Sequence, residues 1–196
     1  KLSFSALVFL LILFLLSVSI VFISPYHEDI NGAVNFDNSG KPPSFDHWFG
    51  TDTAGRDIFT VTIRAGFYSL KIAFGVVLLS VIIGAPIGML SGIASKRIDE
   101  VIMRVTDGFL AFPPLILPVF ITAVLGPSMN NVIIGISISW FPWYVRIARS
   151  RSLIIASSDY VAISKSMGAG KFHIIKNHIL PNSFHSIFTQ ATIDGG

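Results

Sequence analysis

The chain has 196 residues, a formal net charge of +3 at pH 7, 52% hydrophobic residues and only 13% charged residues. Because the hydrophobic residues fall in long runs, the composition indicates a membrane protein rather than a soluble domain. The sequence contains no cysteine, which excludes disulfides, thiolate metal ligands and cysteine nucleophiles.

The first predicted element is a transmembrane helix in residues 1–24. The run from Phe4 to Ser24 carries no charge, and as a helix rising about 1.5 Å per residue it would cross a hydrocarbon core of roughly 30 Å. A signal peptide is the alternative, but its apolar part is normally only about 7–15 residues long and precedes a small-x-small cleavage site. Here the run is longer and ends in Ile-Ser-Pro-Tyr, so we expect a retained span.

Residues 25–71 are predicted to form an outer loop and the segment that leads into the next span. Between residues 25 and 57 the acidic residues far outnumber the basic ones. The acidic residues are Glu28, Asp29, Asp37, Asp46, Asp52 and Asp57, and the basic ones are Lys41 and Arg56.

Within this loop, Gly50 and Gly55 give a superficial likeness to a phosphate-binding loop. Such a loop needs Lys followed by Ser or Thr after the second glycine, so that an amine reaches the phosphates and a hydroxyl reaches the metal. This chain has Arg56 and Asp57 there, and we therefore predict no nucleotide site.

Residues 72–196 are predicted to form the membrane core, with three further spans and the start of a fourth. These are Ile72–Ala94, Gly108–Leu125, Asn131–Val145 and a segment that begins near Pro181. In the first of them, Ser80, Gly84, Gly88 and Gly92 recur every four residues, which puts small residues on one helical face where a neighbouring backbone can approach closely. We expect this stripe to serve helix packing rather than a direct role in substrate binding.

Prolines interrupt the predicted span Gly108–Leu125. Pro113, Pro114 and Pro118 each remove a backbone donor, and the first two would distort a helix sharply. The distortion fits a helix beside a transport pathway, where water satisfies the freed carbonyl groups, and equally an ordinary kink in a packing helix.

The distribution of basic residues predicts the topology. Residues 146–176 carry Arg146, Arg149, Arg151, Lys165, Lys171 and Lys176 against only Asp159. Because short loops rich in Lys and Arg stay cytoplasmic, we predict a multi-pass protein of the cell membrane. The amino end, the loop 96–107 and the loop 146–180 would be inside and residues 25–71 outside.

No spacing typical of a catalytic or metal site is found. The histidines His47, His173, His178 and His185 lack the His-Glu-x-x-His spacing that puts two ligands on one helical face. We therefore predict no catalytic, cofactor-binding or metal-binding residue on this chain, and no nucleic-acid partner. Arg104 and Asp107, three residues apart, are expected to pair across one helical turn.

Residues 159–180 are predicted to form two short helices joined by a bend. Ser157 or Ser158 can cap the first helix, the glycines of Gly168-Ala169-Gly170 end it, and Pro181 suits the first turn of the next span. Apolar residues share one side of this hairpin, namely Tyr160, Ile163, Met167, Phe172, Ile175 and Ile179. This pattern fits an amphipathic hairpin on lipid headgroups and also docking into a groove on a protein.

Two stretches of this region resemble a known family. YVAISKSMGA at 160–169, followed by HILPN at 178–182, resembles the EAA signature of ABC-importer permease subunits. Ala162-Ile163-Ser164 replaces the Glu-Ala-Ala core of that signature. In that family the loop forms a coupling helix that docks on a separate ATPase subunit. The resemblance implies that the ATPase-coupling residues are Tyr160, Val161, Ala162, Ile163, Ser164, Met167 and Gly168, with Gly168 at the turn.

A second resemblance lies in the outer loop. HWFGTD at 47–52 and AGRD at 54–57 are similar to the outer-loop motif of the second permease of dipeptide and oligopeptide importers, as is the stretch from Arg104 to Pro113. The motif residues are Gly50, Thr51, Asp52, Gly55, Arg56 and Asp57. The resemblance covers residues 45–194. Because full-length relatives have six spans, we expect this chain to be a fragment with about five of them.

The resemblance implies an all-α integral membrane protein, a multi-span helical bundle that imports di- or oligopeptides by alternating access. The expected partners are a second permease subunit, ABC ATPase subunits that bind ATP and Mg²⁺, an external solute-binding protein and membrane lipid. An ion-gradient-driven transporter or channel is the alternative, and it predicts buried charges at mid-membrane, which the complete predicted spans lack. Nickel chelates and short sugars stay open as cargo.

Overall fold

The structure is a computed structural model of the chain, and it describes residues 11–12, 14–19, 24–30 and 32–195. The chain divides into two compact units, residues 1–71 and residues 72–196, which are described separately. The predicted span Phe4–Ser24 lies largely outside the described residues. Of that segment, residues 11–12 and 14–19 are helical.

The first unit contains few regular elements. They are α2 (His27–Ile30), the 3₁₀ turn η1 (Phe36–Asn38) and the beginning of α3 (Ile58–Ile93). The residues between η1 and α3 are irregular and include a single antiparallel bridge between Thr51 and Asp57. A hydrogen bond of 2.9 Å between the hydroxyls of Ser24 and Thr60 ties the segment before α2 to the first turn of α3.

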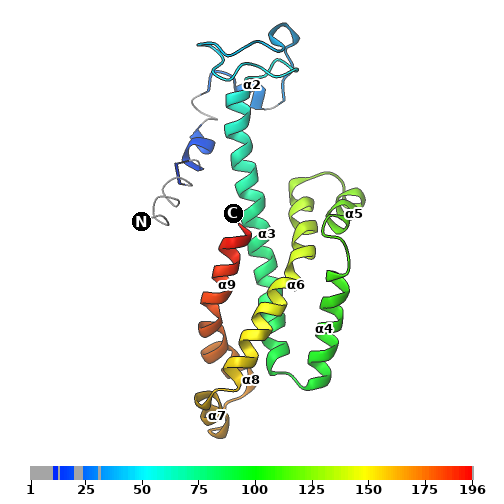
Figure 1. Cartoon of the computed structure of the whole chain (residues 1–196), viewed down its shortest axis with the longest axis vertical. Helices are drawn as coiled ribbons and strands as arrows, with labels where there is room; N and C mark the ends of the chain where they lie inside the picture. The colour runs from blue at the N-terminus through cyan, green and yellow to red at the C-terminus, as the bar shows by residue number, and fades with distance from the viewer. Residues whose placement is uncertain (1–10, 13, 20–23, 31, 196) are drawn as a thin grey trace. The chain divides into compact units, whose positions relative to one another are not determined.

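The second unit is a helical bundle with a short hairpin at one end (Figure 1). Its elements are the rest of α3, α4 (Lys96–Leu110), α5 (Ile116–Leu125), α6 (Met129–Ala156), α7 (Asp159–Ser166), α8 (Lys171–Ile174), the π-helical turn η2 (Ile175–Ile179) and α9 (Leu180–Asp194). Helix α6 lies at the centre of this unit and contacts α4, α5, α7 and α9.

The small-residue stripe on α3 lies against α6. A Cβ atom added at Gly84 would meet the Phe141 carbonyl oxygen, and one added at Gly88 would meet the Val145 carbonyl oxygen. At Gly92 the added atom would meet Cβ of Ser152. The two helix backbones therefore approach so closely that a larger side chain at these positions would force them apart.

The predicted span Gly108–Leu125 is not one helix, because α4 ends at Leu110 and α5 begins at Ile116. Proline lacks an N–H and disfavours helical geometry in the residue before it, and Pro113-Pro114 lies within the break. Pro118 sits inside α5, near enough to its start to be tolerated.

The predicted span Asn131–Val145 is too short, because α6 extends from Met129 to Ala156. The hydropathy of a segment indicates whether it suits lipid, but it does not indicate whether the segment is helical. Because arginine is a good helix former, the basic residues after Val145 continue the helix. The first part of the predicted loop 146–180 is therefore helical. By length and composition, α3 alone among the described helices could cross a membrane, and α5 is a shorter apolar helix.

Candidate functional site

The buried apolar residues of the hairpin between α6 and α9, residues 157–179, belong to the common core of the second unit. Val161 and Ile179 are fully buried and Ile174 is 2% exposed. Gly168 lies between α7 and α8 with a φ of +88°, a left-handed conformation that glycine adopts without steric cost. Ser158 occupies the N-cap of α7, but its hydroxyl donates to the Ile155 carbonyl rather than capping the helix.

The π-helical turn changes which residues face this core. We expected Phe172, Ile175 and Ile179 to share the apolar face, but Phe172 is 77% exposed while Ile174 is buried. A π-helical turn, with its i→i+5 hydrogen bonds, spans Ile175–Ile179. It shifts the helical register by part of a turn, so Ile174 replaces Phe172 beneath Ile179.

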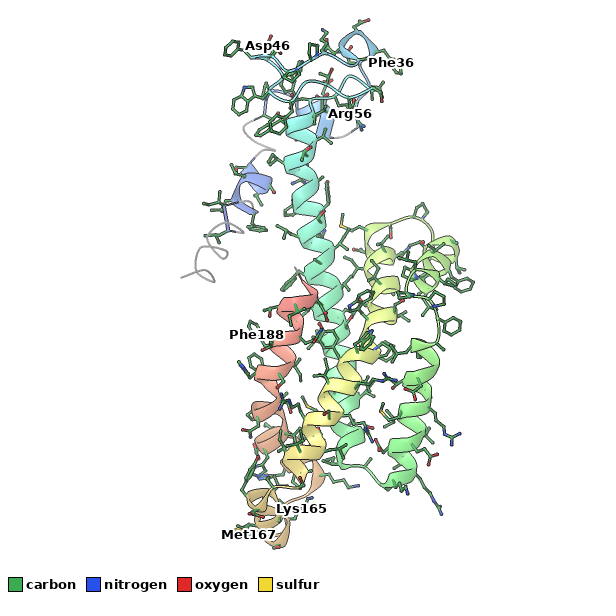
Figure 2. All side chains as sticks on the ribbon, viewed as in Figure 1. Phe36, Asp46, Arg56, Lys165, Met167 and Phe188 are labelled. Atoms are coloured by element: carbon green, nitrogen blue, oxygen red, sulfur yellow. The ribbon has the colours of Figure 1, made fainter. Side chains whose placement is uncertain are left out.

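The outer surface of the hairpin carries large apolar side chains with no cover from the described chain. They are Tyr160, Ile163, Met167 and Phe172, with Met167 the most exposed at 83%. Figure 2 shows Lys165 and Met167 at the tip of the hairpin. We call these four apolar residues the tip patch. Exposed large apolar side chains gathered on one short segment are typical of a site that another protein or a membrane covers.

The remaining predicted coupling residues have different surroundings. Val161 is buried inside the hairpin, where it can support the tip patch but cannot itself touch a partner. Ala162 is exposed, and the Ser164 hydroxyl lies 3.2 Å from Nε2 of His178. Ser164, Met167 and Gly168 also line a surface hollow of about 370 Å³ at the bend.

An ion pair fixes the helix that leads into the hairpin. Arg149 on α6 donates from Nε and from one terminal nitrogen to the two carboxylate oxygens of Asp99 on α4, at 2.5 and 2.6 Å. The Ser91 hydroxyl donates to the same carboxylate at 2.5 Å. The hydrogen bonds from Arg149 and then from Ser91 hold the pKa of Asp99 below its usual range. Three helices, α3, α4 and α6, are thereby joined at one end of the unit.

The expected pair between Arg104 and Asp107 is not formed. Arg104 donates to Glu100, four residues earlier in α4, at 2.6 Å, and Asp107 accepts from Arg146 on α6 at 2.7 Å. Pairs four residues apart are as close on a helix surface as pairs three apart, and the neighbouring helix offers Asp107 a second arginine. The prediction failed because the sequence did not show which helix would lie alongside.

The outer-loop motif folds into a turn that caps α3. The Asp57 carboxylate accepts from the Thr60 amide at 2.8 Å and lies 3.0 Å from Nδ1 of the largely buried His47. The Asp52 carboxylate accepts from the amides of Ala54 and Arg56 and from Nε of Arg56. Hydrogen bonds from the Arg56 amide and guanidinium lower the pKa of Asp52.

The glycines of this motif are required by shape. Gly50 and Gly55 have φ values of +75° and +79°. A side chain at Gly50 would meet the Lys41 carbonyl, and one at Gly55 the Asn35 carbonyl. Thr51 is buried, and its hydroxyl accepts from the Lys41 amide. The polar side chains of the motif are thus hydrogen-bonded within the outer loop and the first turn of α3.

Sequence reasoning missed a carboxylate in α9. Asp194 accepts from the Tyr144 hydroxyl at 2.7 Å and from the Gln190 side-chain amide at 2.8 Å. Tyr144 is fully buried in α6. The spacing of Ser186, Gln190 and Asp194, four residues apart, was the available signal, because it puts polar groups on one face of an apolar helix.

No group of three or more potential metal ligands was found among the described residues. The described residues include one helix that is long and apolar enough to cross a membrane, and a hairpin with exposed apolar side chains. This combination fits the class of helical membrane proteins that dock a partner through a loop.

Comparison with known proteins identifies the family. The model of the family described as "binding-protein-dependent transport system inner membrane component" matches residues 84–196. The chain belongs to this family, and the resemblance predicted from the two motifs is confirmed.

The similar curated proteins are peptide permeases by name. A probable D,D-dipeptide transport system permease protein of Escherichia coli (strain K12) is 41% identical over 155 residues, 79% of this chain and 52% of that protein. Dipeptide transport system permease proteins of Alkalihalophilus pseudofirmus and Bacillus subtilis (strain 168) are 39% identical over 162 residues and 34% over 193 residues. These matches cover 83% and 98% of this chain, and 53% and 59% of the relatives. The chain thus spans about half the length of the curated relatives that it matches.

Proposed function

We propose that this chain is part of a permease subunit of an ATP-driven importer of di- or oligopeptides. In this proposal the chain contributes about five of six spans to the cell membrane, with its amino end and the hairpin in the cytoplasm. The partners would be a second permease subunit, ABC ATPase subunits that bind ATP and Mg²⁺, and an external solute-binding protein. The family membership and the names of the relatives support the proposal.

The tip patch is the observation that carries it. Four large apolar side chains on a short hairpin are exposed in the chain alone, and the hairpin continues directly into α6 and α9. A partner that seats this patch in a groove would move both helices when the groove closes. That linkage is what coupling ATP hydrolysis to transport requires.

The proposal is tested in the complete transporter, reconstituted with its ATPase and binding protein. Ile163→Asp and Met167→Asp would each put a carboxylate into the apolar contact, and the few side chains that dominate an interface contribute about 2 kcal/mol or more. We expect substrate-stimulated ATPase activity and uptake to fall at least about tenfold, while insertion and assembly of the permease persist. Ser157→Asp adds the same charge on the exposed surface outside the tip patch and should have little effect.

Full stimulated ATPase activity in the doubly substituted transporter would overturn the placement of the contact. Purification of the intact permease without any ATP-hydrolysing partner would instead favour the ion-gradient alternative. The family does not favour that alternative.

A further inference from the structure

An open groove with both apolar and polar lining residues runs between α6 and α9. It encloses about 750 Å³ and is lined by side chains of both helices. The cationic or polar members include Arg146, Arg151, His185, Thr189 and Gln190. None of the described residues that line it is acidic.

One end of this groove adjoins a carboxylate. Gln190, which lines the groove, donates to Asp194 at 2.8 Å, and Asp194 retains partial exposure. Both of its recorded donors, Gln190 and Tyr144, are neutral, and no cation in the described part of the chain forms an ion pair with it. A carboxylate has about four acceptor positions, so it can accept further donors.

The other end is cationic. Arg151 and His185 form no ion pair with any residue that the structure describes, whereas Arg146 is paired with Asp107. Charge along the groove is therefore separated, negative near Asp194 and positive near Arg151.

This face cannot lie against lipid tails. In the predicted topology residues 146–180 are cytoplasmic, and Tyr144, which binds Asp194, comes two residues before them, so the groove lies near the cytoplasmic end of the spans. Charged groups that face lipid are costly and almost always face a water-filled cavity or a protein partner instead. The groove face is therefore expected to meet water or protein, as the wall of a transport path does.

The spacing of the charges suits a short peptide. Tyr144, which binds Asp194, and Arg151 are seven residues apart on α6, a rise of about 10 Å. An extended chain spans at most about 3.3–3.6 Å per residue, so the charged ends of a di- or tripeptide are separated by roughly 7–11 Å. A zwitterion of that length matches the groove in both sign and distance.

We propose that the groove between α6 and α9 forms one wall of the peptide path. In this arrangement Asp194 receives the ammonium group of the peptide, and Arg151, with His185 on the facing helix, receives the carboxylate. This inference rests on the proposed function and adds to it the residues that distinguish a free peptide from one with blocked ends.

The test measures uptake by the complete reconstituted transporter. One dipeptide with uncharged side chains is supplied in free, N-acetylated and C-amidated forms, each at a concentration that saturates the external binding protein. Asp194→Asn should reduce the preference for the free over the N-acetylated form by about tenfold or more, because a site built for a polar group rejects an analogue that lacks it. It should leave the preference over the amide unchanged. Arg151→Gln should reduce the preference for the free over the C-amidated form and leave the preference over the N-acetylated form unchanged. Arg104→Gln, at an exposed arginine outside the groove, should change neither ratio.

Because each ratio compares the uptake of two peptides by the same preparation, a loss of assembled protein does not change it. If Asp194→Asn fails to assemble, Arg151→Gln decides alone, because Arg151 is exposed. Unchanged ratios in both variants would overturn the inference. Loss of co-purifying phospholipid in Arg151→Gln with unchanged ratios would do so too, by identifying a lipid headgroup site. If the wild-type transporter imported no peptide, the proposed function would fail and this inference with it, whereas unchanged ratios in an active importer would overturn the inference alone.

Discussion

Two compact segments outside the predicted spans can be compared, namely the outer loop (residues 35–57) and the hairpin (residues 157–179). Each contains a glycine at positive φ, but they use their side chains in opposite ways. In the outer loop the polar side chains of the motif bind within the unit: Asp52 and Asp57 accept from amides of the loop and of α3. In the hairpin, Ile163 and Met167 face outward without cover from the described chain. A motif in a loop can therefore serve folding in one place and recognition in another.

The glycines make this difference measurable. A Cβ at Gly55 would overlap the Asn35 carbonyl, whereas a Cβ at Gly168 would meet no described atom within 4 Å. Both have positive φ, at +79° and +88°. In the outer loop the backbone of another residue therefore packs directly against Gly55, whereas the space beside Gly168 in the hairpin is empty.

The largest effect is expected from Gly55→Ala. The left-handed backbone costs an alanine about 1–2 kcal/mol, and the overlap with Asn35 adds about 1–3 kcal/mol, so we expect a loss of about 3 kcal/mol. Hydrogen exchange of the amides of residues 35–57 in the full protein measures it. Gly40→Ala is the matched control, since Gly40 has a φ of +65° but open space around it, and it should cost only about 1 kcal/mol. Equal effects would show that the loop is not closed at Gly55.

A second pair of substitutions separates folding from recognition within the hairpin. Ile174→Ala removes a buried side chain and should destabilise the hairpin by about 3 kcal/mol. Phe172→Ala, two residues away and 77% exposed, should change stability by less than about 0.5 kcal/mol and yet reduce stimulated ATPase activity. Thermal unfolding and ATPase assays on the same preparations measure both. A large loss of stability from Phe172→Ala would mean that its side chain belongs to the core.

These pairs also show what the sequence could predict. The bend at Gly168 and the apolar spacing of α7 follow from local rules of helix termination and periodicity, and both were predicted. The inward position of Ile174 was not, because a π-helical turn is a tertiary compromise that leaves no reliable trace in hydrophobic spacing.

Charge pairing was the other feature beyond reach of the sequence. Asp99 and Arg149 are fifty residues apart, and only the packing of α4 on α6 brings them together. Asp107 similarly pairs with Arg146 rather than with Arg104. Family resemblance located both motifs, but it did not reveal that Asp57 caps α3, which required the hydrogen bonds themselves.

The smallest effect is expected from acid, and it tests whether the outer loop uses its charges internally. The pKa of Asp52 is lowered in the folded loop, chiefly by the Arg56 amide and guanidinium. The folded pKa is therefore below the unfolded value of about 3.9, so the stabilisation is fully present above about pH 4 and is lost as the pH falls through the folded pKa.

Asp52→Asn keeps an oxygen that can accept from the Ala54 and Arg56 amides but removes the charge. It should make hydrogen exchange in residues 35–57 less sensitive to acid below pH 4, whereas Asp37→Asn, at an exposed residue of the same loop, should leave that sensitivity as in the wild type. Because Asp52 is partly exposed, salt should weaken the difference. An acid response identical in all three proteins would mean that the charge of Asp52 contributes nothing to the fold of the loop, and that its backbone hydrogen bonds alone hold the turn.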